Sequence, residues 1–337
     1  MTEHTYKAAG VDVYAADRFK QRLSAIVSPT HGPEVLGGVG AFGAMYQLAG
    51  YREPVIVSST DGVGTKLWVA AHLGHFESIG QDLVTLNVND ILTRGAKPLF
   101  FLDYVSFTTL DEQRMETLMR GIVWGCREVG CALIGGETAQ HSATSHEDDL
   151  ELAGFVVGVV ERDNMVDGSE MSVGDYLIGI PSSGLHTNGF SLVRMLFNID
   201  QNPSVLFQHY DELGHQLGEE LMIRHRCYFP LLEPVLGRVK GLAHITGGGL
   251  PGKIPAILPA ELAASFQTGS WQVPPIFDLI QRQGAVPTED MYRVFNMGLG
   301  LVLVCDRTRV EEVRSRVPEA RVVGEVMAAA GDRRGVL

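Results

Sequence analysis

The sequence predicts a two-domain protein that mixes helices and strands. Its 337 residues exceed the length at which one hydrophobic core usually stops growing. Apolar strand-like runs alternate with segments whose apolar residues recur at helical spacing, as in α/β or α+β folds. An acidic, turn-rich segment at residues 161–175 has no such pattern. We therefore expect domains at residues 1–168 and 169–337, the first opening with a flexible arm, residues 1–35.

Strands are expected where short runs rich in β-branched and aromatic residues are bounded by turn residues. In the first domain these runs are PVIVSS (54–59), LFFLDYVSF (99–107), CALI (131–134) and LAGFVVGVV (152–160). In the second domain they are YLIGI (176–180), LAHI (242–245), LGLVLVCD (299–306) and ARVVGEV (320–326).

Helices are expected between these strands. Residues 78–95 have apolar side chains at helical spacing, and Gly95 is the expected stop. Residues 110–130 form a second candidate, with Asp111 as N-cap and Gly130 as stop. Shorter helices are expected at NGFSLVRMLF (188–197) and LPGKIPAIL (250–258).

Charge and composition restrict the classes of function. The chain carries 40 acidic and 27 basic residues, a formal net charge of −13. This charge argues against non-specific binding of nucleic acid, but it permits binding of a small anion by backbone N–H groups. No apolar run approaches the ~18–20 residues that span a bilayer, and the N-terminal residues lack the apolar centre of a signal peptide. We expect a cytoplasmic protein with no membrane or nucleic-acid partner.

The stretch TDGVGTK combines an acid, exposed backbone and a base where a strand ends. Gly62 and Gly64 allow close approach of a ligand to the backbone. Asp61 repels phosphate directly but is suited to holding Mg²⁺ beside it, and Lys66 adds positive charge. The spacing is not that of a Walker A loop. A β-turn with solvated Asp and Lys fits the same residues.

Two further segments of the first domain carry acids. In a helix over 78–95, Asp82 and Asn89 share a face, and Asp90 lies about 80° from Asp82. LIGGETA places Glu137 after a strand and two glycines. A solvated helix face and a simple turn explain each segment alone. Together with Asp61, the three segments favour a shared Mg²⁺–nucleotide site.

The second domain offers two polar, glycine-rich segments in place of acids. SSGLHTNGFS (182–191) follows a strand and leads into a helix, an arrangement suited to a phosphorylated ligand. His186 within it is able to exchange a proton near neutral pH, although a structural histidine fits equally. HITGGGLPG (244–252) permits close backbone approach or a tight turn.

Ten motifs follow one another along nearly the whole chain. They are YKAAGVDV, PEVLGGVGAFGA, SSTDGVGTKL, IGQDLVTLNVNDI, GAKPLFFLDY, GCALIGGETA, LAGFVVGVVE, SSGLHTNGFSLVR, HITGGGLPGKIP and MYRVFNMGLG. Together they resemble the phosphoribosylformylglycinamidine cyclo-ligase family, also called aminoimidazole ribonucleotide (AIR) synthetases, of purine biosynthesis. TDG, ND and GGET are shared across a wider superfamily, whereas YKAAGVDV and GLHTNGFSLVR narrow the resemblance to the cyclo-ligases.

The resemblance implies a PurM-like two-domain architecture with an α+β N-terminal domain, which forms the sheet or barrel of a homodimer, and an α/β C-terminal domain. It implies ATP and Mg²⁺ on the first domain, with Asp61, Asp90 and Glu137 as metal ligands. The residues implied around the nucleotide are Gly37, Gly38, Gly40, Gly43, Thr60, Asp61, Gly62, Val63, Gly64, Thr65, Lys66, Asp82, Asn89, Gly135, Gly136, Glu137 and Thr138. Those implied at the substrate are Ser183, Gly184, His186, Asn188, Gly189, Thr246, Gly247, Gly248 and Gly249.

The implied reaction is ATP-dependent ring closure of formylglycinamidine ribonucleotide to 5-aminoimidazole ribonucleotide, with release of ADP and phosphate. Phosphorylation of the formyl amide oxygen creates a good leaving group, and an amidine nitrogen of the same molecule attacks the activated carbon. The implied catalytic residues are His186, Lys66 and Asp90. Lys66 and Mg²⁺ offset charge on the transferring phosphoryl group, and His186 moves a proton or orients the carbonyl.

The chain departs from the family pattern in three places. QHSATS (140–145) replaces the usual EMPGMY, and RHRCY (224–228) replaces PTRIY, which removes any role of that threonine and adds two cations. The N-terminal arm has Ser24 and Ser28 where lysines are usual, so no nucleotide-contacting lysine is assigned there, and Lys20 and Arg22 are the available substitutes.

Other members of the superfamily fit less well. A thiamine-monophosphate kinase would share the acids but not YKAAGVDV. A selenophosphate synthetase would have a reactive cysteine near its start, and the first cysteine here is Cys126. A hydrogenase-maturation relative would end in cysteine, and a formylglycinamidine synthetase would be far longer. A nucleotide-binding scaffold without activity also remains an alternative, against which the retained acids argue.

Overall fold

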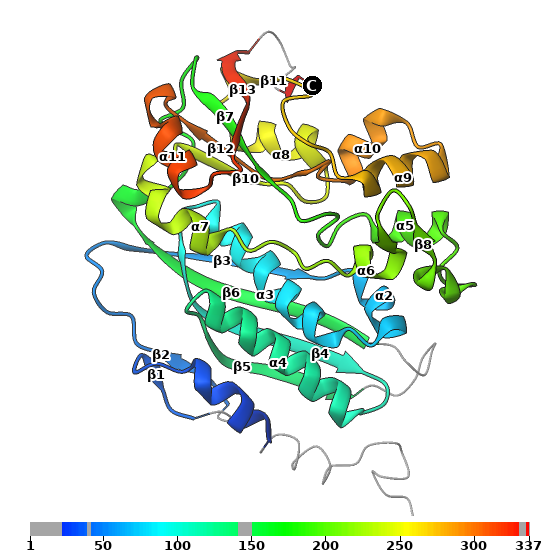
Figure 1. Ribbon diagram of the computed structural model, residues 1–337. Coiled ribbons are helices and arrows are strands. Elements are labelled where there is room, and N and C mark those ends of the chain that lie inside the picture. Colours follow the sequence, from blue (N-terminus) through cyan, green and yellow to red (C-terminus); the bar gives the residue numbers. More distant parts are fainter. Residues whose placement is uncertain (1–21, 39–41, 141–149, 330–334, 337) are drawn as a thin grey trace, which may run out of the picture.

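The computed structural model describes residues 22–38, 42–140, 150–329 and 335–336. Two sheets, each combined with helices, form two domains that follow one another along the chain (Figure 1). The mixed helix-and-sheet architecture expected from the sequence is confirmed. Among the described residues, no helix combines the length and apolar character needed to cross a membrane.

The N-terminal sheet has four strands in the order β3 (Pro54–Gly62), β6 (Leu150–Glu161), β4 (Lys97–Phe107) and β5 (Ala132–Gln140). β4 and β5 are parallel, and the other two pairs are antiparallel. Helices α3 (Phe76–Leu92) and α4 (Glu112–Glu128) lie together on one face of this sheet (Figure 1). The four predicted strands and both helices of this domain are present.

The local signals at the helix ends behave as the sequence predicted. The Asp111 side chain accepts a hydrogen bond from the Arg114 N–H and caps α4. Gly95 and Gly130 follow α3 and α4 in the left-handed backbone region that favours glycine. One prediction was too short. The strand at CALI continues through GGET, so Glu137 lies within β5 and not in a turn after it.

An N-terminal segment runs along the β5 side of the domain. Residues 22–27 are helical, and η1 (Ser28–Thr30) leads to a small hairpin of β1 (Val35–Leu36) and β2 (Met45–Tyr46). The Leu133 N–H donates to Thr30 Oγ1 at 3.0 Å, and the Leu133 carbonyl lies 2.7 Å from His31 Nε2. The hairpin is therefore beside β5, away from the C-terminal domain (Figure 1).

The C-terminal sheet has the strand order β10 (Gly241–His244), β12 (Leu299–Cys305), β7 (Tyr176–Pro181), β13 (Arg321–Ala328), β11 (Leu262–Phe266) and β14 (Gly335–Val336). All pairs except β11–β14 are antiparallel. The remaining elements are α2 (Lys66–Leu73), η2 (Arg162–Asn164), α5 (Phe190–Leu196), η3 (Pro203–Phe207), β8 (His209–Tyr210), β9 (His215–Gln216), α6 (Leu217–Leu221), α7 (Phe229–Leu232), η4 (Glu233–Arg238), α8 (Gly249–Ile257), α9 (Pro275–Gly284), α10 (Thr288–Val294), η5 (Arg307–Arg309) and α11 (Val310–Arg316).

The larger apolar core passes from one domain into the other without a break. It contains Leu83 and Val88 of α3 together with Phe190, Leu232 and Leu301 of the second domain. A second core, which includes Leu177 and Val302, fills the other side of the C-terminal sheet. Because the domain boundary is itself close-packed, the loops that meet there are held in fixed relative positions.

Candidate functional site

Two carboxylates meet at the end of β3 that faces the C-terminal domain. Asp61 is near the end of β3, and Asp90 lies in the last turn of α3. Asp90 accepts hydrogen bonds from Ser59 Oγ at 3.1 Å and from His244 Nδ1 at 2.9 Å. Asp61 accepts one from the Gly62 N–H at 2.8 Å. We call this group, Ser59, Asp61, Asp90 and His244, the carboxylate corner.

Electrostatics at the carboxylate corner favour a cation. Desolvation raises the pKa of Asp61 above its ordinary value, and the negative charge of Asp90 raises it further. The Gly62 N–H, His244 and Lys253 act in the opposite direction. Two neighbouring carboxylates with additional oxygen donors are the ligand set that Mg²⁺ prefers, so these residues fit the ion that the sequence predicts.

The glycine turn after Asp61 packs against the second domain. Gly62 lies so close to β6 that a Cβ there would approach the Leu152 carbonyl oxygen to 2.7 Å. Gly64 has a φ of 57° in the left-handed region. Thr65 Oγ1 lies 3.1 Å from Ser191 Oγ, so the turn and the first turn of α5 face each other. The glycines are therefore needed to bring the acid-bearing turn to the domain boundary.

Both predicted substrate segments of the second domain arrive at the same place. The Gly247 N–H donates to Asn188 Oδ1 at 3.0 Å, which joins the loop at 183–189 to the glycines at 246–249. Asn296 Nδ2 donates to the Gly184 carbonyl at 2.8 Å and so holds the loop at 183–189 in place. Gly247 and Gly248 are exposed, whereas His186 is buried with a φ of 61°. A left-handed backbone at a non-glycine residue costs free energy and is typical of functional loops.

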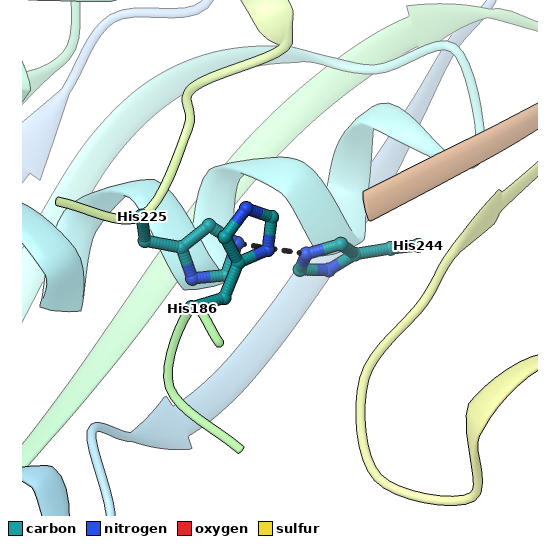
Figure 2. A group of neighbouring side chains, drawn as sticks. All are labelled: His186, His225 and His244. Carbon is teal, nitrogen blue, oxygen red and sulfur yellow. Dashed lines mark hydrogen bonds between the residues drawn. The ribbon is translucent and has the colours of Figure 1, made fainter. Parts of the chain in front are cut away.

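Three buried imidazoles lie behind these loops. His186 and His225 stack with ring centroids 3.9 Å apart, and His225 Nε2 lies 3.1 Å from His244 Nε2 (Figure 2). Burial holds the pKa values of His186 and His225 well below the ordinary value, and the neighbouring His244 lowers both further. Both rings are therefore neutral near pH 7.

Lys66 and Asp82 do not face the open part of this site. Both side chains are fully buried, and Lys66 Nζ lies 2.6 Å from Asp82 Oδ2 and donates to the Ile223 carbonyl at 2.9 Å. Burial raises the pKa of Asp82, while the positive charge of Lys66 opposes that rise. In this arrangement neither side chain extends to a surface where a nucleotide could lie, so their roles at the nucleotide stay predictions.

The polar face of α3 instead holds a segment of the second domain. The His225 N–H donates to Asp82 Oδ1 at 2.7 Å, and the Tyr228 N–H donates to Asn89 Oδ1 at 3.0 Å. Asn89 Nδ2 donates in turn to the Arg226 carbonyl at 2.9 Å. Asp82 and Asn89 share a helix face, as their spacing predicted, and their partners are the backbone groups of residues 225–228.

Glu137 lies far from the carboxylate corner within one chain. Glu137 is on β5, where it pairs with Tyr104 of β4, whereas Asp61 is on β3, at the opposite edge of the sheet. Three strand spacings separate these edges by roughly 14 Å. The structure therefore brings together Asp61 and Asp90 but not Glu137.

Glu137 has its own group of predicted nucleotide residues. Gly135, Gly136 and Thr138 accompany it on β5, and a Cβ at Gly135 would lie 3.8 Å from Ala44 at the end of the glycine loop. Gly37, Gly38 and Gly43 belong to that loop, while Gly40 lies outside the described residues. The described residues predicted at the nucleotide thus lie mainly in two groups at opposite edges of one sheet, which we call the β3 and β5 half-sites, while Lys66, Asp82 and Asn89 are buried at the polar face of α3.

Several residues of the site carried too weak a sequence signal to be selected. Ser59 and His244 complete the carboxylate corner, and Lys253 on α8 acts electrostatically on Asp61. His225 was noted only as part of the altered RHRCY segment. A histidine next to a glycine run was the available signal for His244, and it becomes informative only when the fold places it beside Asp90.

The departures from the family pattern are described in part. Residues 224–228 cross α3, and Arg224 pairs with Glu128 and lies over the Trp124 ring, with 4.1 Å between its guanidinium carbon and the ring centroid. In the other altered segment Gln140 ends β5, and residues 141–145 lie outside the described part of the chain. Lys20 lies outside it as well, and Arg22 forms ion pairs with Glu112 and Glu116 of α4.

Comparison with known proteins first defines a class. Residues 43–160 match the N-terminal domain of AIR synthase related proteins, and residues 172–336 match the C-terminal domain of the same class. The fold resembles thiamine-monophosphate kinase from Stenotrophomonas maltophilia, with a TM-score of 0.66 at 16% identity over 94% of each chain. It also resembles the hydrogenase maturation protein HypE in complex with ATP, with a TM-score of 0.63 at 16% identity over 93% of this chain and 89% of that one.

Sequence comparison then identifies the family. The chain is 45% identical to a phosphoribosylformylglycinamidine cyclo-ligase from Carboxydothermus hydrogenoformans over 100% of this chain and 99% of that protein. It is 46% identical to one from Geobacillus kaustophilus over 97% of this chain and 96% of that protein. The chain belongs to the phosphoribosylformylglycinamidine cyclo-ligase family, as its motifs predicted.

Proposed function

We propose that this protein catalyses ATP-dependent ring closure of formylglycinamidine ribonucleotide to 5-aminoimidazole ribonucleotide, with release of ADP and phosphate. The observation that carries this proposal is 45% identity to a cyclo-ligase over the full length of both chains. The meeting of the carboxylate corner with the loops around His186 and Gly247 supports it. Such an enzyme acts on small molecules in de novo purine biosynthesis in the cytoplasm.

Asp61 and Asp90 are the groups of one chain best suited to hold Mg²⁺ and the ATP phosphates. Their charges repel each other, and a divalent ion between them removes that repulsion. Bound Mg²⁺–ATP supplies the phosphoryl group, which converts the formyl oxygen into a leaving group. Lys253 acts electrostatically on Asp61 and is the cation we assign to face the phosphates from the C-terminal domain.

His186 is suited to a proton step during ring closure. Its Nε2 accepts a hydrogen bond from the Ser183 N–H at 3.2 Å, so the neutral ring carries its proton on Nδ1. Nδ1 is buried and has no hydrogen-bond partner in the described structure. This N–H is the group we expect to orient the substrate carbonyl. Replacing His186 with Gln should therefore lower kcat and leave KM unchanged.

We also propose a homodimer formed by the outer face of the N-terminal sheet. Ile56, Tyr104 and Phe155 are 55%, 39% and 37% exposed, and strand register places all three on the face opposite α3 and α4. Glu137, opposite Tyr104 on the adjacent strand, shares that face. If two copies pair through this face about a two-fold axis, the carboxylate corner of one copy can meet the β5 half-site of the other.

The direct test of activity is to mix the purified protein with formylglycinamidine ribonucleotide, ATP and Mg²⁺. Equal yields of ADP and aminoimidazole ribonucleotide are expected. Binding of Mg²⁺–ATP without product would overturn the assigned substrate and indicate another phosphoryl acceptor. The control omits the ribonucleotide and measures background ATP hydrolysis.

The dimer is tested by mixing two inactive variants, Asp61→Asn and Glu137→Gln. If each site takes Asp61 from one copy and Glu137 from the other, a mixed dimer contains one intact site. Random mixing should then restore about a quarter of the wild-type turnover. A mixture as inactive as its components, in a sample where co-purification of differently tagged copies shows that subunits have exchanged, contradicts the shared site.

A further inference from the structure

Three imidazoles from distant segments converge at the domain boundary. His186 comes from the loop after β7, His225 from the segment before α7, and His244 from the end of β10. They are 2%, 0% and 4% exposed. One ring nitrogen from each lies within 4.8 Å of the other two, the metal-ligand geometry that they alone satisfy in the described part of the chain (Figure 2).

Two of the nitrogens already have the separation that a bound metal needs. His225 Nε2 and His244 Nε2 lie 3.1 Å apart. Nitrogen ligands on a tetrahedral Zn²⁺ with bonds of about 2.0–2.1 Å lie about 3.3 Å from each other. Binding a metal at this pair therefore requires movements of only a few tenths of an ångström.

Hydrogen bonds around the pair direct both lone pairs toward the same point. Asn89 is fixed in orientation by Tyr228 and Arg226, and its Nδ2 lies 3.4 Å from His225 Nε2, which is therefore an acceptor. Asp90 accepts from His244 Nδ1, which leaves Nε2 of a neutral His244 as the free lone pair. Two facing lone pairs require a positive centre between them, either an additional proton or a metal ion.

His186 supplies the third nitrogen. Its Nδ1 is buried, has no hydrogen-bond partner in the described structure, and points toward His244 (Figure 2). Coordination through Nδ1 moves the ring proton to Nε2 and breaks the bond from the Ser183 N–H, and the ring must tilt from its stacking on His225. A metal on Nδ1 therefore takes the place of the Nδ1–H contact with the substrate carbonyl, which belongs to the metal-free ring. The loss of one peptide hydrogen bond is small beside the formation of metal–nitrogen bonds.

Asp90, which accepts a hydrogen bond from His244, has the position that a carboxylate commonly takes behind a metal-binding histidine. A histidine that binds a metal usually donates its other N–H to a carboxylate or carbonyl, which fixes the ring and increases its basicity. Asp90 meets this condition for His244 at 2.9 Å, and Thr187 Oγ1 lies 3.4 Å from His225 Nδ1. In two of the three rings, His225 and His244, Nδ1 therefore has a hydrogen-bond partner and Nε2 is left to face the other ring.

We propose that this chain binds one divalent transition-metal ion of the zinc class through His186, His225 and His244. Three neutral nitrogens select Zn²⁺ or Co²⁺ over Mg²⁺, which prefers oxygen ligands, so this ion is distinct from the Mg²⁺ assigned to Asp61 and Asp90, and His244 joins the two sites. A fourth ligand, such as water, would complete a tetrahedral shell. His225 lies in the RHRCY segment, where the chain departs from the family pattern.

The test uses the full-length protein stripped of metal with a chelator and titrated with Co²⁺, whose tetrahedral complexes absorb visible light. One equivalent of Co²⁺ should give this absorption, and Zn²⁺ should displace it. His225→Thr should weaken Co²⁺ binding at least tenfold, while His209→Ala, an exposed histidine on β8, should leave it unchanged.

The outcomes are separable from the proposed activity because neither readout uses substrate. Absence of a stoichiometric Co²⁺ signal in the wild type, or equal affinity in His225→Thr, overturns the proposal. Should His225→Thr fail to fold, anomalous diffraction from wild-type crystals soaked in Zn²⁺ decides it. A zinc peak bonded to all three ring nitrogens supports the site, and its absence there overturns it.

Discussion

Asp61 and Asp103 lie in the same row of the N-terminal sheet but in different surroundings. Each pairs across the sheet with Gly154, one from β3 and one from β4. Burial raises the pKa of both, and a neighbouring carboxylate, Asp90 or Glu137, raises each further. His244 and Lys253 oppose the rise at Asp61, whereas the pKa of Asp103 reaches about 7.

This difference shows how one sheet presents two unlike edges. The β3 edge is covered by the C-terminal domain, which supplies an imidazole and a lysine to its carboxylates. The β5 edge carries Glu137 on an exposed strand position beside the glycine loop of the arm. The covered edge contains its own counter-charge, and the open edge is the one that a second copy can complete.

The largest expected effect is on stability, at the buried ion pair of Lys66 and Asp82. Lys66→Met leaves Asp82 buried without its partner, which should lower the free energy of unfolding by about 3–5 kcal/mol. Urea denaturation followed by circular dichroism measures the change. Lys97→Met, at an exposed lysine of β4, is the matched control.

The same pair separates a structural role from a catalytic one. Adding Asp82→Asn to Lys66→Met removes the unpaired charge and keeps the acceptor for the His225 N–H, so most of the lost stability should return. If Lys66→Met loses less than about 1 kcal/mol of stability but most of its turnover, the ammonium acts on the phosphoryl group instead.

Removing one carboxylate from either edge should cost turnover. Asp61→Asn and Glu137→Gln should each lower kcat by about 10²–10³-fold and raise the Mg²⁺ concentration required, because both are predicted ligands of one ion. Steady-state kinetics over a range of Mg²⁺ concentrations measures both effects. Glu151→Gln, exposed on β6, is the control, and full activity of Glu137→Gln would exclude the β5 edge from the site.

A methyl group added behind the covered edge should disturb His186. Gly300 lies so close to the histidines that a Cβ would approach Tyr228 Oη to 1.9 Å and His186 Cε1 to 2.5 Å. Gly300→Ala should therefore destabilise the protein by about 1–3 kcal/mol and lower kcat. Gly237→Ala, where a Cβ meets open space, is the control for thermal denaturation and kinetics. Wild-type behaviour of Gly300→Ala would show that the two rings have room to move.

Stability should also depend on pH through Asp103, a buried residue of β4, the strand next to the open edge. Its folded pKa of about 7 lies above the unfolded value, so the folded chain holds a proton that the unfolded chain has lost. The resulting stability is present at low pH and is lost as pH rises through 7, with a slope of at most about 1.4 kcal/mol per unit. Asp103→Asn should flatten urea midpoints between about pH 4 and 7, the window between the unfolded and folded pKa values, whereas the exposed Asp290→Asn should not.

The smallest expected effect is at Lys253, which opposes the raised pKa of Asp61 from α8. Lys253→Ala should lower kcat/KM about tenfold, because a phosphate-facing charge is lost. It should also shift the acid limb of the pH–rate profile upward, since Asp61 then holds its proton to higher pH. An unshifted acid limb, identical to that of Lys97→Ala, would show that Lys253 does not act on Asp61.

Local patterns in the sequence were sufficient for most elements. The expected strands and the two long helices are present, and Asp111 caps α4 as predicted, because these depend on neighbouring residues. Shorter elements such as β11 and α9 to α11 were not predicted. The extension of β5 through GGET was also missed, since strand pairing with β4 overrides the tendency of two glycines to end a strand.

The sequence by itself determined the family, the alternation of helices and strands, and the residue types that could bind a metal or a phosphate. The tertiary structure alone decided which of them meet. It paired Lys66 with Asp82, placed Asn89 against a crossing backbone, put Glu137 at the far edge, and gathered His186, His225 and His244. The physical reason is that these contacts join residues far apart in the chain, whose distances are set by strand order and domain packing.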